Sequence, residues 1–174
     1  MNRSEAELTG LMREAVEYGI RHVESGGLPF VGVVVGDGGY VSAPGVNLVH
    51  ETQDTTAHAE IVAMREALSK RDDLRGTWLL ATGEPCGLCY RFAIDHGVER
   101  VYVAVDSDTA AAYGFDYRRS YPAYGVNPSR LAATGMVRRL EVPRGLEPFE
   151  RFLHIGHGGA QPPSASPTKS KGTS

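Results

Sequence analysis

The chain has 174 residues, of which 41% are hydrophobic and 22% charged, and its formal net charge is −3. This length suits one domain with a buried core, and the composition is ordinary for a globular protein. No apolar run approaches the roughly 20 residues of a membrane span, and residues 1–4 do not resemble a signal peptide. Proteins dedicated to binding phosphate backbones usually carry a basic surplus, which this mildly acidic chain lacks. We therefore expect a cytoplasmic protein without membrane or RNA partners.

The first half of the chain alternates helical and strand patterns. Apolar residues at helical spacing predict a helix over residues 8–23, which ends at a Ser-Gly-Gly sequence. A β-branched run predicts a buried strand at residues 30–35, and the glycine-rich turn at 36–39 predicts a hairpin with a returning strand at 40–43. We expect a loop over residues 46–56, a helix over 57–69 and a strand over 77–81.

The second half continues this alternation. We expect a helix over residues 86–96, a strand over 101–105, a strand over 136–142 and a helix over 148–155. The stretch at 112–128 is rich in Tyr, Gly and Pro and is too long for a simple connection. The order predicts a three-layer α/β/α domain at residues 1–155 with a mixed sheet. The Gly-, Pro- and Ser-rich residues 156–174 are predicted to form a disordered tail.

Two short fragments contain the residues with the most distinctive chemistry. Cys86 and Cys89 are the only cysteines, and their spacing places both thiols on the first turn of a predicted helix, whose positive end favours thiolates. His58, at the start of the preceding helix, supplies a third ligand. Two thiolates and one imidazole suit Zn²⁺ and leave a fourth tetrahedral position for water. Glu60 lies close enough to His58 in sequence to reach that water and accept its proton.

Other interpretations of this pattern remain open. A Cys-x-x-Cys pair is also found in redox proteins, although these usually lack a His-x-Glu partner. A structural zinc site needs four protein ligands, and only three residues here have suitable spacing. A zinc-bearing interaction domain without activity is a further alternative, although such a domain has no need of Glu60.

The combination of His-x-Glu with a later Pro-Cys-x-x-Cys is the zinc deaminase signature. Because it has this signature, the chain resembles the cytidine deaminase-like superfamily over roughly residues 8–153. Within the superfamily it resembles most closely the guanine deaminase branch, and it also resembles tRNA adenosine deaminases. The fragments that support this resemblance are residues 27–35, 45–47, 56–60, 84–89 and the Gly-Phe-Asp sequence at 114–116. The resemblance implies a five-stranded mixed sheet, one Zn²⁺ per chain, and a homodimer in which residues 112–155 close the active site of the partner.

The resemblance also implies roles for single residues. His58, Cys86 and Cys89 would bind zinc, and Glu60 would carry protons between water, a ring nitrogen and the leaving amine. Asn47 matches an asparagine that hydrogen-bonds the substrate ring. The reaction would be hydrolytic: oxygen replaces the amino group on a ring carbon, and ammonia leaves.

Further residues are expected around the substrate. Phe30 matches an aromatic residue in the pocket wall, and Asp116 belongs to the Gly-Phe-Asp sequence. The backbone N–H groups of Ala59 and Cys86, at two helix N-termini, are expected to face polar atoms of the ligand.

Three positions depart from the guanine deaminase pattern. Tyr117 replaces a second acidic residue, Asp95 stands where the family has an aromatic, and no Tyr or Trp follows Tyr124 near the C-terminus. An Asp would select an amino, guanidino or ring N–H donor instead of stacking on a ring. We therefore expect a small-molecule amino heterocycle as substrate, purine-like or of another class such as a cytosine, pterin or triazine. An RNA-editing deaminase is the rival interpretation, but the basic residues are scattered.

Overall fold

A five-stranded mixed sheet forms the centre of the fold, and a computed structural model describes it together with the rest of residues 2–156. The strands are β1 (Val31–Val35), β2 (Gly45–Val46), β3 (Trp78–Gly83), β4 (Arg100–Val105) and β5 (Val137–Arg139). Their order is β2-β1-β3-β4-β5; β1 is antiparallel to β2 and β3, whereas β3, β4 and β5 run parallel. This arrangement confirms the predicted mixed sheet.

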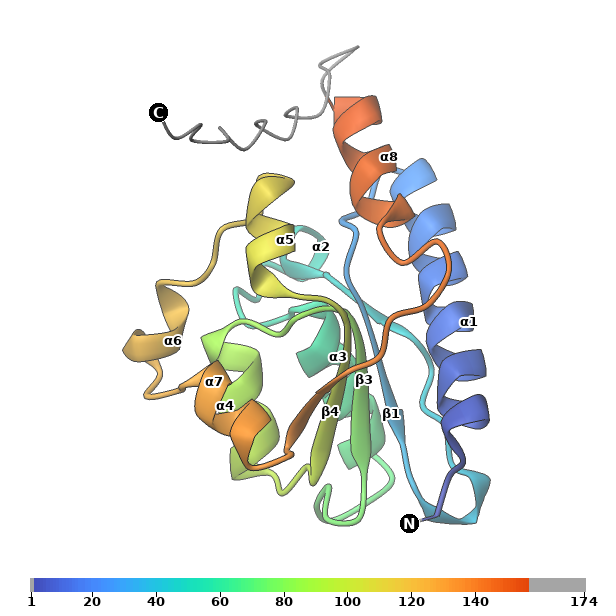
Figure 1. Cartoon of the computed structure of the whole chain (residues 1–174), viewed down its shortest axis with the longest axis vertical. Helices are drawn as coiled ribbons and strands as arrows, with labels where there is room; N and C mark the ends of the chain where they lie inside the picture. Colours follow the sequence, from blue (N-terminus) through green and yellow to red (C-terminus); the bar gives the residue numbers. More distant parts are fainter. Residues whose placement is uncertain (1, 157–174) are drawn as a thin grey trace, which may run out of the picture.

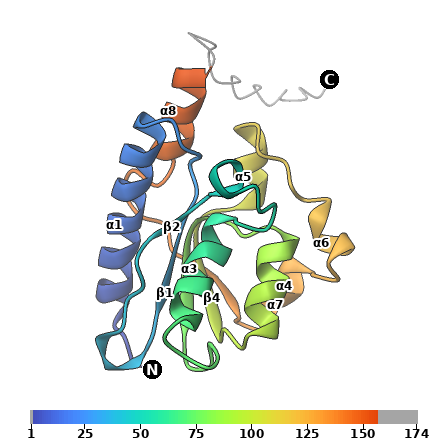
Figure 2. The same ribbon diagram turned by 180° about the vertical axis from the view of Figure 1, so that it is seen from behind.

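Helices cover both faces of the sheet. The helices are α1 (Glu5–Glu24), α2 (Val49–Thr52), α3 (Ala59–Leu68), α4 (Gly87–Asp95), α5 (Ser107–Ala112), α6 (Ser120–Ala123), α7 (Pro128–Ala133) and α8 (Glu147–Gly156), with a 3-10 turn, η1, at Asp37–Gly39. Figure 1 and Figure 2 show α1 and α8 side by side on one side of the sheet and α3, α4 and α7 on the other. The three-layer α/β/α architecture is therefore confirmed.

The two helical layers explain the burial pattern of the strands. All five residues of β1 and all six of β3 are buried, because a strand between two helical layers has no face left for water. Val34 packs with residues of α3 and α4, while its neighbours Val33 and Val35 pack with residues of α1 on the opposite side. A third cluster around Phe149 of α8 gathers aromatic side chains at one end of the sheet.

The returning strand of the hairpin differs from the prediction. Between residues 40 and 43 only Val41 forms a bridge, with Val35, and β2 begins later, at Gly45. The Ser42 hydroxyl accepts the N–H of Val34 at 2.9 Å, while the N–H of Ser42 donates to the carbonyl of Val34 at 2.8 Å. This side-chain bond replaces a ladder bond, and Pro44 follows without an N–H, so regular pairing resumes only after it.

Several other boundaries shift by a few residues. The predicted loop at 46–56 contains the short helix α2, the helix expected from residue 57 begins at Ala59, and β5 is shorter than the strand expected at 136–142. The stretch at 112–128 contains α6. Gly156 ends α8 and is not part of the predicted tail, whose other residues, 157–174, lie outside the described part of the chain.

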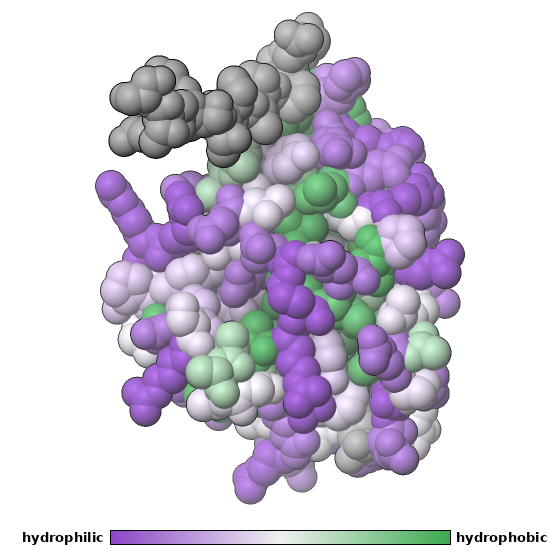
Figure 3. Space-filling model, viewed as in Figure 1, coloured by the Kyte–Doolittle hydropathy of each residue, from purple (hydrophilic) through white to green (hydrophobic). Residues whose placement is uncertain are grey.

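The described residues form a polar exterior on the side seen in Figure 3. Hydrophilic side chains predominate there, and hydrophobic ones are visible mainly in a band down the middle of the view. Among the helices of residues 2–156, none combines the length and the apolar character that a membrane crossing requires.

Candidate metal centre and active site

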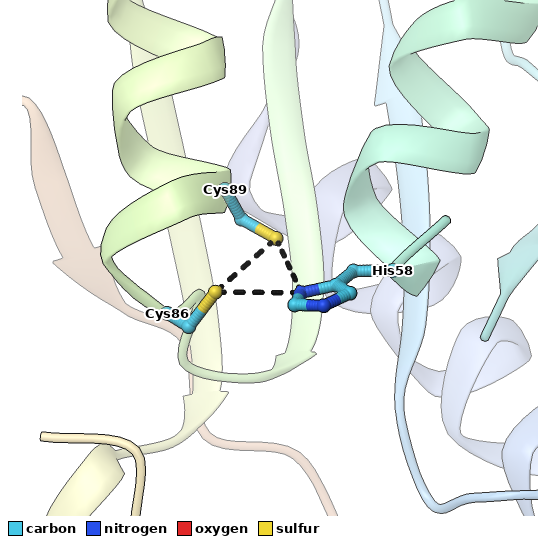
Figure 4. A group of neighbouring side chains, drawn as sticks. All are labelled: His58, Cys86 and Cys89. Atoms are coloured by element: carbon cyan, nitrogen blue, oxygen red, sulfur yellow. Dashed lines mark hydrogen bonds between the residues drawn. The ribbon is translucent and has the colours of Figure 1, made fainter. Parts of the chain in front are cut away.

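Three potential metal ligands meet where the N-termini of α3 and α4 approach each other. His58 is the residue that caps α3, Cys86 caps α4, and Cys89 lies in the first turn of α4. Nδ1 of His58 is 3.4 Å from Sγ of Cys86 and 3.5 Å from Sγ of Cys89, and the two sulfurs are 3.6 Å apart. Figure 4 shows the three side chains pointing toward one another from these two helices. The structure thus brings together all three predicted ligands.

The triangle of donor atoms has the size that Zn²⁺ requires. Tetrahedral bonds of about 2.3 Å to sulfur and about 2.0 Å to nitrogen separate two sulfurs by about 3.8 Å and a sulfur from a nitrogen by about 3.5 Å. The observed separations, 3.6 Å between the sulfurs and 3.4–3.5 Å from sulfur to nitrogen, lie close to these values. Two sulfurs and one imidazole also match the chemistry of a zinc site with one open position. The donor set therefore fits zinc.

The charge state of Cys86 suits metal binding. The hydrogen bond of Cys86 with Cys89, and after it the bond with His58, lower the pKa of Cys86 to about 4. The pKa of Cys89 is raised, first by its hydrogen bond with Cys86 and then by burial. A thiolate is the form that coordinates a metal, so Cys86 offers one at neutral pH.

Two glycines explain why the first turn of α3 lies directly on the sheet. A Cβ at Gly32 of β1 would lie 2.8 Å from the Cα of Glu60, and a Cβ at Gly45 of β2 would lie 2.2 Å from the carbonyl oxygen of Ala59. Both distances are shorter than any ordinary contact between carbon and backbone atoms. The absence of side chains at these two positions therefore sets the depth of α3, and with it the positions of His58 and Glu60.

Glu60 is a buried carboxyl group beside the three donors. It is 4% exposed, and its Oε2 lies 3.3 Å from Sγ of Cys89. Burial, and after it the negative charge of Cys86, raise the pKa of Glu60 to about 7. A carboxyl group in this position is adjacent to the metal ligands without belonging to the donor triangle.

A cavity of about 190 Å³ opens beside the metal ligands. Its lining residues are Leu28, Phe30, Asn47, His58, Ala59, Glu60, Glu84, Cys86, Phe115 and Tyr117. The ring of Phe30 packs edge-on against Phe115, Tyr117 and Phe149, with centroids 5.1, 6.0 and 5.3 Å away. These contacts fix the apolar part of the cavity wall.

Four of the six expected substrate-contacting residues line this cavity: Phe30, Asn47, Ala59 and Tyr117. The amide oxygen of Asn47 accepts the N–H of Val49 at 3.1 Å, which leaves its NH₂ group to face a ligand. The structure places every one of these four in the pocket that His58 and Cys86 also line.

The other two residues lie elsewhere. Asp95 is the exposed last residue of α4, and Arg91, one turn earlier, donates to it at 3.0 Å. Asp116 is exposed and forms a two-pronged ion pair with Arg118. Neither aspartate lines the cavity of the single chain, and a substrate contact for either one stays a prediction.

Residues for which the sequence predicted no role also line the cavity, notably Leu28, Glu84 and Phe115. Phe115 and Tyr117 face the pocket, whereas Asp116 between them faces solvent. This alternation is the one expected of a non-helical segment, and it was a signal that could have favoured Phe115 over Asp116.

The chain matches a known family over most of this site. The family is described as "Cytidine and deoxycytidylate deaminase zinc-binding region", and the match covers residues 6–105, which include all three donors and Glu60. The chain belongs to this family. Its cysteine pair is thus part of a deaminase zinc site, which explains the donor triangle better than a redox pair does.

Guanine deaminases are among the similar proteins. The chain is 34% identical over 108 residues to guanine deaminase from Bacillus subtilis, covering 60% of this chain and 69% of that one. The solved structure of the B. subtilis enzyme superposes with a TM-score of 0.57, over 61% of this chain and 69% of that chain. Guanine deaminase from Nitrosomonas europaea superposes with a TM-score of 0.68 at 27% identity, over 87% of this chain and 85% of that chain.

Proteins that act on tRNA also match this chain. The tRNA-specific adenosine deaminase of Haemophilus influenzae is 33% identical over 104 residues, which are 58% of this chain and 60% of that protein. Two much longer relatives match over a short part of their length. The chain spans 17% of tRNA(Ile)-lysidine synthase from Deinococcus deserti at 35% identity, and 6% of the chloroplastic tRNA(adenine(34)) deaminase of Arabidopsis thaliana at 39%.

Proposed function

We propose that this protein is a zinc-dependent hydrolase that replaces an amino group on a free heterocyclic base by oxygen and releases ammonia. The observation that carries this proposal is the position of Glu60, a buried carboxyl group between the donor triangle and a cavity for a small flat ligand. A structural zinc site has no need of such a group. Bound at these donors, Zn²⁺ supplies Lewis-acid activation of a water molecule.

Glu60 moves the protons in this proposal. Its carboxylate accepts one proton from the attacking water and delivers it to a ring nitrogen of the substrate. It then transfers the second proton of the water to the amino group as the bond between carbon and nitrogen breaks, so that ammonia leaves and the carbonyl product remains. Burial of Glu60 keeps bulk water from competing for these protons.

The walls of the cavity orient the ring. Phe30, Phe115 and Tyr117 present aromatic surface, which suits a flat heterocycle. The NH₂ group of Asn47 donates to an acceptor on the ring, because its amide oxygen is already engaged by Val49. These contacts place the carbon that bears the amino group toward Glu60 and the metal ligands.

The size of the cavity favours a free base over a nucleoside. Pockets that take drug-sized ligands have volumes of roughly 300–1,000 Å³, and this one has about 190 Å³. The guanine deaminases among the relatives make guanine the first substrate to test. Cytosine, a pterin or a triazine is the alternative, because neither Asp95 nor Asp116 lines the cavity to read a purine edge.

An adenosine in tRNA is a less favoured substrate. The family includes tRNA deaminases, but Arg118, in the segment that lines the cavity, is neutralised by Asp116 and Asp108 at 2.8 and 2.9 Å. A basic residue paired in this way adds little to the attraction of a phosphate backbone.

An ammonia-release screen of the zinc-loaded protein tests the proposal. The substrates are guanine, guanosine, cytosine, cytidine, adenine, aminopterins, aminotriazines and a tRNA anticodon stem-loop. We expect turnover of one or more free bases, and Glu60→Gln should keep one zinc per chain while losing about 10²–10⁴-fold in rate. Full turnover by Glu60→Gln would refute the mechanism. Activity on the stem-loop alone would favour the tRNA function.

Three further expectations accompany this function: a homodimer, exchange of residues 112–155 between its subunits, and a cytoplasmic location. In the single chain, α8 packs against α1, and Arg144 and Arg151 pair with Glu17 and Glu24 of α1. Light scattering measures whether two chains associate, and crosslinking between α1 and α8 distinguishes an exchanged segment from one that stays within its own chain.

A further inference from the structure

Three tyrosine hydroxyls converge on the two residues that precede the zinc ligand Cys86. Tyr117 donates to the main-chain carbonyl of Glu84 at 2.5 Å, and Tyr121 donates to the carbonyl of Pro85 at 3.0 Å. Tyr90 donates to the side-chain Oε1 of Glu84, also at 3.0 Å. We refer to Tyr90, Tyr117 and Tyr121 as the tyrosine clamp.

The side chains of the tyrosine clamp lie in a largely buried environment. Tyr90 is 0% and Tyr121 7% exposed, and burial raises the pKa of all three phenols, so that they stay protonated donors. The second carboxylate oxygen of Glu84 accepts the N–H of Ser107 at 2.7 Å. Buried acceptors that lose such partners are costly, so the Glu84-Pro85 segment has few alternative positions.

The clamp joins two parts of the chain that are distant in sequence. Tyr90 belongs to α4, whereas Tyr121 belongs to α6 and Tyr117 precedes it. A second connection lies beside them, where the N–H of Gly87 donates to the hydroxyl of Ser120 at 2.8 Å. The segment after α5 is therefore hydrogen-bonded to the loop that carries Cys86.

Cys86 depends on this support more than Cys89 does. Cys89 lies within α4, where the helix itself fixes its backbone, whereas Cys86 is an extended residue before the helix, with φ −70° and ψ 174°. Its backbone position is therefore set largely by the peptides that precede it, those of Glu84 and Pro85.

We propose that the tyrosine clamp is a set of positioning residues that hold Cys86 at the distance from Cys89 and His58 that zinc requires. The hydroxyls act through the Glu84-Pro85 segment and do not touch the metal. Outer contacts of this kind typically change metal affinity by about 10–100-fold when they are removed.

Tyr121→Phe is the direct test, because Tyr121 does not line the cavity and the variant removes one oxygen atom only. Tyr124→Phe is the matched control, since Tyr124 lies three residues later and is 43% exposed. Two readouts are independent of activity: zinc affinity, measured by competition with a chromogenic chelator, and the absorption spectrum of the Co²⁺-substituted protein. Tyr90→Phe provides a second clamp variant in case Tyr121→Phe does not fold.

We expect the folded clamp variants to bind zinc about tenfold or more weakly and to show altered thiolate-to-cobalt absorption bands, while Tyr124→Phe matches the wild type. A clamp variant with a lower melting temperature but wild-type zinc affinity and cobalt spectrum would overturn the proposal, because the hydroxyls would then stabilise the fold alone. Neither readout needs a substrate, so a failure of the proposed deaminase activity leaves this test unaffected.

Discussion

Replacing Gly32 by alanine tests how closely α3 must lie against the sheet for the site to work. The new Cβ would stand 2.8 Å from the Cα of Glu60, 3.0 Å from the carbonyl oxygen of Ala59 and 3.2 Å from the backbone nitrogen of Glu60. All three atoms belong to the backbone, so no side chain can rotate out of the way. The first turn of α3 must therefore move.

The size of this movement follows from ordinary contact distances. Two carbon atoms in contact prefer a separation of about 3.5–4.0 Å, so Glu60 must retreat by at least about 0.7 Å. Overpacking of this kind costs about 1–3 kcal/mol of stability. A misplacement of about 1 Å in a catalytic group costs about 10²-fold in rate. We expect Gly32→Ala to stay folded, to lose about 1–3 kcal/mol, and to lose up to about 100-fold in kcat.

The assay combines ammonia release, zinc affinity and urea unfolding on the same preparation. Gly10→Ala of α1 is the control, because a Cβ at Gly10 meets nothing within 4 Å and alanine favours a helix by about 1 kcal/mol. This control should be at least as stable as the wild type and fully active. Wild-type stability and kcat in Gly32→Ala would refute the reasoning, because the backbone contact would then be no constraint.

Three further predictions concern the metal, the aromatic wall and acid stability. Stripping zinc with a chelator should abolish ammonia release and lower the melting temperature, and added Zn²⁺ but not Mg²⁺ should restore both. Phe149→Ala should cost about 3–5 kcal/mol in urea unfolding, because Phe149 is 0% exposed; Phe149→Leu, the control, should cost much less. Hydrogen bonds from Arg144 and then Arg151 lower the pKa of Glu147 from 4.5 to about 2, so the stabilisation it provides is present above pH 4.5 and is lost as the pH falls toward 2. The difference in unfolding free energy between the wild type and Glu147→Gln should therefore shrink over this range, and a constant difference would contradict this assignment.

The sequence predicted the elements of the fold well where local pattern and tertiary packing agree. The ligand-bearing helices and the buried strands were recognised from their apolar periodicity and their β-branched runs, because both helical layers demand apolar residues there. The register of the hairpin was missed. It depends on a hydrogen bond from Val34 to the Ser42 side chain, and no hydrophobic pattern encodes that bond.

The sequence predicted the metal ligands of the candidate site but not all of the residues that line its cavity. His58, Cys86 and Cys89 follow from a spacing of residue types that suits zinc, whereas Asp95 and Asp116 follow only from their position relative to a family pattern. Both aspartates have a nearby arginine, Arg91 one turn before Asp95 and Arg118 two residues after Asp116. An ion pair at i, i+4 on a helix is a common surface feature, and this spacing favoured an exposed role for Asp95.

Part of the apolar wall of the cavity comes from a different stretch of the chain than the metal ligands. The metal ligands and Glu60 lie within residues 6–105, the stretch that matches the family, whereas Phe115 and Tyr117 lie beyond it, and so does Phe149, which packs behind Phe30. Substitutions of Phe115 or Phe149 can therefore reshape the space offered to a ligand without removing a hydrogen bond that supports Cys86. Exchanging residues 106–156 between relatives, with Tyr117 and Tyr121 retained, accordingly tests whether this stretch sets the choice of ligand while the metal ligands stay unchanged.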